Sequence, residues 1–72
     1  MIDVIQYDNE YRITFPYKFE IKEIVKAIPG RSWNPEGKYW SIPLNHLGML
    51  INQFKGTEYE SRIRIRSKEH IN

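Results

Sequence analysis

The part of the sequence best suited to binding a ligand is residues 31–44. Two tryptophans, a tyrosine and two cations fall within these fourteen residues. The rings and charges of segment 31–44 belong to Arg31, Trp33, Lys38, Tyr39 and Trp40. Proteins that bind single-stranded nucleic acid stack bases on aromatic rings and hold phosphates with cations. The segment therefore predicts a surface that binds single-stranded nucleic acid. The alternative is that the tryptophans are core residues, which is the favoured interpretation for Trp40 because it shares a strand face with Ile42.

Two further patterns are basic. Arg62, Arg64 and Arg66 alternate without an intervening acid, and a strand would space them about 6.6 Å apart, close to the repeat of phosphates along a nucleic acid. This favours an anion-binding surface, with a solvated strand face or a protected sheet edge as the alternative. A lysine stripe follows the helical repeat at Lys18, Lys22 and Lys26, for which a solvated helix face is the simpler interpretation.

The sequence shows no cluster of residues that could catalyse a reaction or bind a metal. There is no cysteine, and His46 and His70 have no second ligand at a metal-binding spacing. The four glycines form neither a phosphate loop nor a dinucleotide fingerprint. We therefore expect no catalytic residue, no metal, no cofactor and no small-molecule substrate, so that the isolated chain is not an enzyme.

Hydrophobic periodicity predicts the elements that position these residues. Alternating patterns predict strands at 2–7, 11–15, 31–33, 38–42 and 58–66. Apolar residues at helical spacing predict helices at 18–28 and from a cap at Asn45 to Phe54. Asn34-Pro-Glu-Gly37 has the composition of a type I turn. The order ββ-α-ββ-α-β predicts an α+β domain with a small antiparallel sheet and both helices on one face.

Length and composition bound the other expectations. The chain has 72 residues with a net charge of +2, and it is 40% apolar and 28% charged. We expect one domain at 1–66 and a polar tail or linker at 67–72. The absence of cysteine predicts a reducing compartment, and no apolar run is long enough for a membrane segment.

Segment 31–44 resembles the HARP domain, the accessory module of HepA-related annealing helicases in the SNF2 superfamily. The likeness is carried by Arg31, Trp33, Asn34, Pro35, Glu36, Lys38, Trp40, Ile42 and Leu44. It extends over about residues 19–54, including the Ile-Pro that ends the preceding helix. Two departures are Ile42, where many members are expected to have Phe, and Gly37 in the turn.

The resemblance implies a DNA-binding module that directs an ATP-driven SNF2-type motor, in cis or in trans, to forks and single/double-strand junctions. It places Arg31, Trp33, Lys38 and Trp40 in the functional hairpin. The chain would be an excised domain or a stand-alone relative, in the bacterial cytoplasm at the nucleoid or in a eukaryotic nucleus. The alternative is a protein-interaction module that docks a partner on the aromatic hairpin or by strand addition at Ile63–Ile65.

Overall fold

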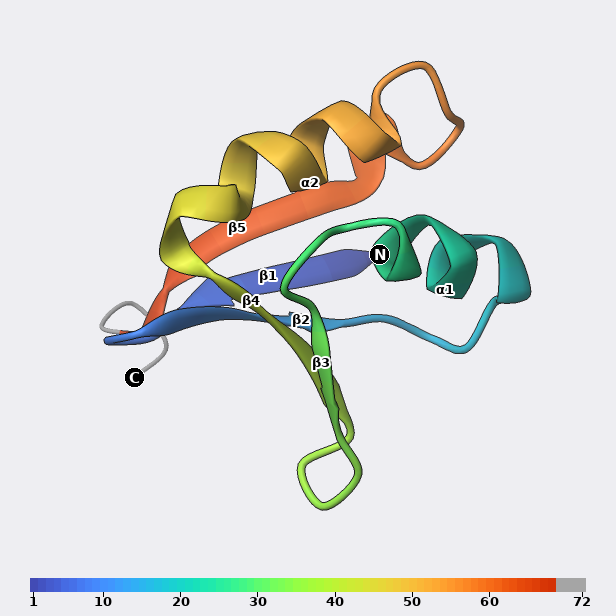
Figure 1. Ribbon diagram of the computed structural model, residues 1–72. Helices are drawn as coiled ribbons and strands as arrows, with labels where there is room; N and C mark the ends of the chain where they lie inside the picture. The colour runs from blue at the N-terminus through green and yellow to red at the C-terminus, as the bar shows by residue number, and fades with distance from the viewer. Residues whose placement is uncertain (69–72) are drawn as a thin grey trace.

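Alternating apolar and polar side chains build a five-stranded sheet in the computed structural model, which describes residues 1–68 (Figure 1). The strands are β1 (Ile2–Gln6), β2 (Glu10–Thr14), β3 (Ser32–Asn34), β4 (Tyr39–Pro43) and β5 (Ile63–Ser67). Their order in space is β3-β4-β2-β1-β5, so β3 and β5 form the two edges. The prediction of a small α+β domain is confirmed, and its sheet continues through Ser67, one residue past the predicted domain end.

The sheet is mixed, so the prediction of a purely antiparallel sheet is wrong. The pairs β1–β2, β2–β4 and β3–β4 are antiparallel, but β5 runs parallel to β1, with Ile2 beside Ile63 and Val4 beside Ile65. The helix between β4 and β5 is the reason. Because it carries the chain back to the end at which β4 began, β5 runs in the same direction as β4, and hence as β1.

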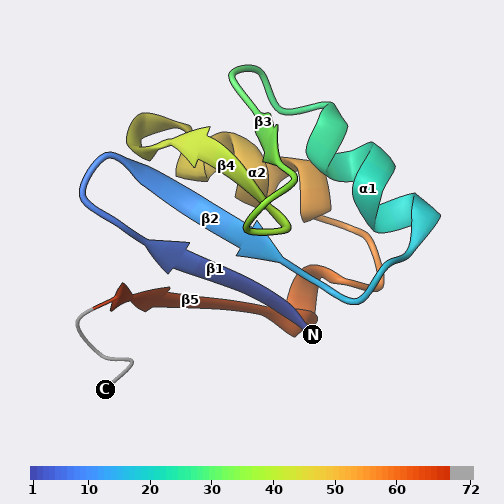
Figure 2. The same cartoon turned by 90° about the horizontal axis from the view of Figure 1, so that it is seen from below.

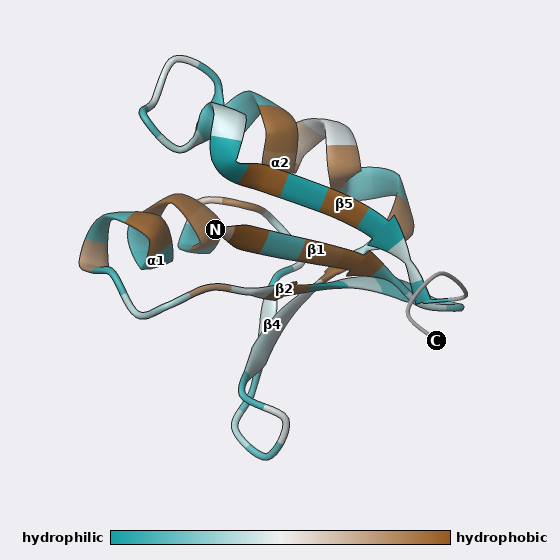
Figure 3. Cartoon of the chain, turned by 180° about the vertical axis from the view of Figure 1, so that it is seen from behind, coloured by the Kyte–Doolittle hydropathy of each residue, from teal (hydrophilic) through white to brown (hydrophobic). Residues whose placement is uncertain are grey.

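Both helices, α1 (Phe19–Lys26) and α2 (Leu47–Phe54), pack on one face of the sheet, as predicted. The sheet contributes Ile2, Val4, Tyr11, Ile13 and Ile42 to the core, and the helices contribute Ile21, Val25, Leu50 and Phe54. The strand residues of this set share one face, because the register pairs Val4 with Ile13 and Tyr11 with Ile42. We call this side the helix face and the other the open face. In Figure 2 α2 passes behind the sheet, and Figure 3 shows the alternating bands along β5.

The connection between α1 and β3 is held against the start of α2. Gly30 has a φ of +81°, and a Cβ there would lie 3.1 Å from Pro43 and 3.2 Å from His46. The Nδ1 of His46 lies 2.7 Å from the carbonyl oxygen of Pro29, a hydrogen bond that His46 donates. His46 is therefore a structural residue that fixes the path of the chain into the hairpin.

Most element boundaries lie within two residues of the prediction, but the starts of α2 and β5 differ for a structural reason. Asn45 does not cap α2, because it lies inside a short 3₁₀ helix, η1 (Leu44–His46), and α2 begins without a side-chain cap. The final strand begins at Ile63 rather than at residue 58, because a second 3₁₀ turn, η2 (Glu60–Arg62), precedes it. The backbone N–H of Arg62 donates to the carbonyl of Tyr59 at 2.9 Å, which closes this turn.

Tyr59 anchors the segment before β5 to α1. Its ring is buried, and its hydroxyl donates to the Glu20 carboxylate at 2.9 Å. This hydrogen bond, together with burial and the nearby Glu58, raises the pKa of Tyr59 to about 12, because an ionised phenol would face a carboxylate in a poorly hydrated position.

Candidate nucleic-acid interface

A groove of about 500 Å³ opens between α1, the end of β2 and the β3–β4 hairpin. Its walls are formed by Ile13, Thr14, Phe15, Tyr17, Lys22, Lys26, Trp33, Lys38 and Trp40. Three successive segments of the chain thus meet at one place, where α1 lies beside the hairpin (Figure 2). The volume falls in the range of about 300–1,000 Å³ that is typical of sites for small ligands.

Aromatic rings dominate one wall of the groove. Trp33 and Trp40 are paired across β3 and β4 on the helix face, with ring centroids 5.2 Å apart and planes inclined by 50°. Trp33 is 47% exposed, whereas Trp40 is half-buried and packs against the core. Trp40 thus combines the two alternatives, since it both supports the core and lines the groove. Tyr17, which is 74% exposed, adds another ring.

Three lysines give the groove its charge. Lys22 and Lys26 lie one helical turn apart on α1, and Lys38 comes from the hairpin loop. Lys26 Nζ lies 3.9 Å from a Glu23 carboxylate oxygen. This is a surface ion pair, and such pairs contribute little free energy. None of the described residues that line the groove is acidic. Two members of the predicted lysine stripe therefore face an aromatic surface, while Lys18 lies just before α1, outside the groove.

The hairpin loop 35–38 is built around the side chain of Asn34. Asn34 Oδ1 accepts the backbone N–H of Gly37 at 2.8 Å, and its backbone carbonyl accepts the N–H of Lys38, also at 2.8 Å. The backbone hydrogen bond thus comes one residue later than in the predicted type I turn. Lys38 adopts a φ of 56°, in the left-handed region that glycine and asparagine favour. This conformation places a charged side chain at a position that a glycine would fill with less strain.

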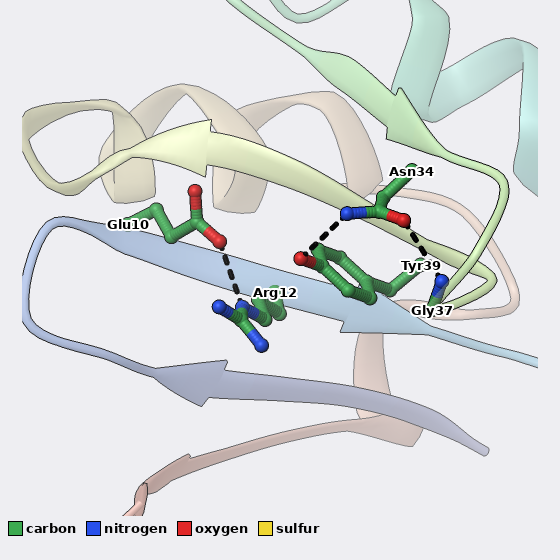
Figure 4. A network of polar contacts seen from close by, with 5 residues as sticks. All are labelled: Glu10, Arg12, Asn34, Gly37 and Tyr39. Carbon is green, nitrogen blue, oxygen red and sulfur yellow. Dashed lines mark hydrogen bonds and ion pairs between the residues drawn. The ribbon is translucent and has the colours of Figure 1, made fainter.

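Tyr39 lies on the open face, away from the groove. Its hydroxyl accepts a hydrogen bond from Asn34 Nδ2 at 2.9 Å, and its ring stacks 4.6 Å from the guanidinium carbon of Arg12 (Figure 4). The same guanidinium lies 3.9 Å from the centre of the Tyr7 ring, and Arg12 Nε donates to Glu10 at 2.7 Å. The hydrogen bond to Glu10 raises the pKa of Arg12 above its ordinary value, so its charge is permanent.

The three arginines do not form a continuous ladder. Arg62 belongs to η2, whereas Arg64 and Arg66 lie on the open face of β5, opposite Asp3 and Ile5 of β1. Arg66 Nη2 contacts the Asp3 carboxylate at 3.3 Å, and its Nε is buried with no acceptor among the described residues. Asp3 of the neighbouring strand β1 therefore interrupts the series of arginines, although no acidic residue interrupts it in the sequence. The structure places Arg64 and Arg66 on the face opposite Trp33 and Trp40.

Of the residues predicted for the site, the structure brings together Trp33, Lys38 and Trp40. Arg31 is exposed next to β3 but does not line the groove. Sequence reasoning missed Phe15 and Tyr17, which flank a proline between a strand and a helix. Phe15 also packs against the core, whereas Tyr17 is exposed.

Other classes of site have less support. Within residues 1–68, no three histidine or acidic side chains gather closely enough to hold a metal ion, and no helix is long and apolar enough to span a membrane. His70 lies outside the described residues.

The chain matches no protein-family model, no curated protein and no solved structure. The resemblance to the HARP domain therefore stays a prediction, and the argument for a function rests on the groove.

Proposed function

We propose that the chain is an accessory DNA-binding module that holds single-stranded or junction DNA in the groove between α1 and the β3–β4 hairpin. The observation that carries this proposal is the convergence of exposed aromatic rings with three lysines in a groove whose described lining holds no acidic residue. Rings of this kind stack on the faces of bases, and the lysines neutralise phosphates on the same strand.

The groove favours unpaired over paired nucleotides. Bases within a duplex are already stacked on both faces, so the rings of Trp33 and Tyr17 can stack only on bases of a single strand or at a junction. Each such contact contributes about 1–3 kcal/mol to binding. The described lining holds no Asn, Gln, Asp, Glu or Arg to recognise base edges, and we propose that its lysines contact phosphates, so that binding is largely independent of sequence.

The resemblance to the HARP domain supplies the wider context of this proposal. An SNF2-type ATPase motor, in the same chain or a separate one, would remodel the DNA, and this module would direct the motor to forks and junctions during repair. The chain itself has no P-loop, so the proposal assigns it recognition and leaves ATP hydrolysis to the motor.

A second candidate function is protein docking at the outer edge of β5. Ile65 lies on the helix face but is 44% exposed, because β5 is an edge strand. A partner could add a strand there and cover this side chain. Such an apolar contact would depend little on salt, in contrast to binding through phosphates.

Fluorescence anisotropy titrations with single-stranded, blunt duplex and forked DNA at two salt concentrations test the DNA-binding proposal. Single-stranded and forked DNA should bind more tightly than the duplex, and each affinity should fall steeply as salt rises. Absence of binding at low salt, or equal binding to a blunt duplex, would contradict the proposal. If a Trp33→Ala variant that folds normally bound DNA as tightly as the wild type, the groove would not be the DNA-binding site.

A further inference from the structure

The open face carries a contact that fixes the hairpin from behind the groove. The guanidinium of Arg12, in the middle of β2, is sandwiched between the rings of Tyr7 and Tyr39, at 3.9 and 4.6 Å. Its Nε is also hydrogen-bonded to Glu10. A planar cation held between two rings and oriented by a carboxylate has little freedom to move, which is a reason for arginine rather than lysine at this position.

The sandwich is connected to the hairpin loop by a short chain of contacts (Figure 4). The hydroxyl of Tyr39 accepts a hydrogen bond from Asn34, whose carbonyl groups accept the N–H groups of Gly37 and Lys38. The ring of Tyr39 also lies over Gly37, so closely that a Cβ on this glycine would overlap it. Movement of the Tyr39 ring therefore disturbs the conformation of the loop that carries Lys38.

The hairpin depends on this contact because its tip extends beyond the paired part of the sheet. In the described sheet the last residues paired between β2 and β4 are Ile13 and Trp40. β3 is an edge strand of three residues that pairs with β4. The Arg12–Tyr39 contact thus ties the tip to the body of the sheet, at a point past the last backbone pair.

We propose that Arg12 is a positioning residue of the DNA-binding groove, which holds Trp33 and Lys38 toward the lysines of α1 without contacting the DNA. This inference rests on the proposed function. Arg12 pairs with Ser41 on the open face, whereas Trp33 and Trp40 lie on the helix face, so a strand in the groove is separated from Arg12 by the sheet. The paired Glu10 also offsets its charge.

The role can be tested because positioning and phosphate contact affect binding differently. Arg12→Leu removes the cation but keeps an apolar stem, and Lys38→Ser serves as the matched control for a direct contact. With a single-stranded oligothymidylate, Arg12→Leu should weaken binding about 3- to 30-fold, the range expected for losing cation–π contacts. It should lower the magnitude of the slope of log K against log salt by no more than the Lys38 contact contributes, because Arg12 acts on phosphate only through the hairpin. Lys38→Ser should lower the magnitude of that slope by about 0.7.

A second readout needs no DNA. Acrylamide quenching of Trp33 and Trp40 fluorescence should increase in folded Arg12→Leu, because a released hairpin exposes its rings more often. Tyr7→Leu removes half of the sandwich from the residue after β1 and should change binding and quenching in the same direction. If circular dichroism shows that Arg12→Leu is unfolded, the Tyr7→Leu variant tests the positioning role in its place.

The outcomes separate the two proposals. Failure of the wild-type protein to bind the oligonucleotide would overturn the DNA-binding function, while increased quenching in the variants would still support the positioning role in the hairpin. Wild-type affinity and quenching in Arg12→Leu would overturn the positioning role alone. A slope lowered by about 1.4 in the Arg12→Leu/Lys38→Ser double variant, the sum of two independent phosphate contacts, would show that Arg12 contacts phosphate directly, and would also overturn it.

Discussion

Replacing Lys38 by glycine should stabilise the protein and weaken its binding to DNA. The φ of 56° costs a residue with a Cβ about 1–2 kcal/mol, a cost that glycine does not have. Glycine offsets about 0.4–1 kcal/mol of this gain, because its greater conformational entropy stabilises the unfolded chain. The free energy of unfolding should therefore rise by about 0.5–1 kcal/mol, which raises the Tm of a domain of this size by about 2–8 °C.

Binding should change in the opposite direction because the lysine also lines the groove. Loss of one phosphate contact lowers the magnitude of the salt slope on single-stranded DNA by about 0.7. Thermal melting followed by circular dichroism measures the first effect, and anisotropy titrations over a series of salt concentrations measure the second. Lys38→Ala is the matched control, since it removes the charge but keeps the strained backbone, and it should reduce the slope without raising the Tm.

Two results would refute this reasoning. A Lys38→Gly variant that melts below the wild type would show that the left-handed conformation is not a source of strain in the folded protein. A variant with the wild-type salt slope would show that Lys38 does not contact phosphate, and the groove would lose the hairpin's contribution to its charge.

Further substitutions test other parts of the structure. Gly37→Ala places a Cβ against the Tyr39 ring and should cost about 1–3 kcal/mol in thermal melting, and an unchanged Tm would contradict this packing. Tyr59→Phe should lose less stability than the wild type as pH rises from 10 toward 12. In the wild type the unfolded tyrosine ionises near pH 10 and the folded one near pH 12, so the folded state loses stability over this range. The same pH dependence of the free energy of unfolding in both proteins would argue against the hydrogen bond of Tyr59. Trp40→Ala should cost about 2–4 kcal/mol of stability, whereas Trp33→Ala should cost less than about 1 kcal/mol but weaken binding to single strands; the reverse order would exchange their roles.

The hairpin could be predicted from sequence because local chemistry specifies it. Asn34, Pro35 and Gly37 have the conformational preferences of a tight turn, and alternation on either side of it fixes which residues share a face. The predicted shared face of Trp40 and Ile42 is accordingly confirmed. These preferences do not determine the loop in detail, and the left-handed Lys38 was not anticipated.

The direction of β5 could not be predicted from alternation, since side chains alternate along both parallel and antiparallel strands. The signal lay in the connection, because a strand, a helix and a strand in succession favour parallel strands. The same limit applies to the arginines. Their sequence neighbours include no interrupting acid, but Asp3, about sixty positions away, reaches Arg66 only because β1 pairs with β5.

The groove exists only in the folded protein. The sequence shows a lysine stripe on a helix and an aromatic hairpin as separate patterns, and both have ordinary structural explanations. Packing α1 beside the hairpin brings Lys22 and Lys26 to the rings of Trp33 and Tyr17. No local preference encodes this arrangement, because it depends on how α1 packs across the helix face of the sheet, beside the hairpin.

The most direct test of the groove compares the salt dependence of two triple variants on single-stranded DNA. One variant replaces the groove lysines, Lys22, Lys26 and Lys38, with serine, and the other replaces Arg62, Arg64 and Arg66. The groove predicts that the lysine variant loses about two units of the log–log salt slope, at about 0.7 per phosphate contact, while the arginine variant keeps most of its slope. A full slope in a folded lysine variant, together with a loss of about two units in the arginine variant, would contradict the groove and place the DNA on the arginine side of the sheet.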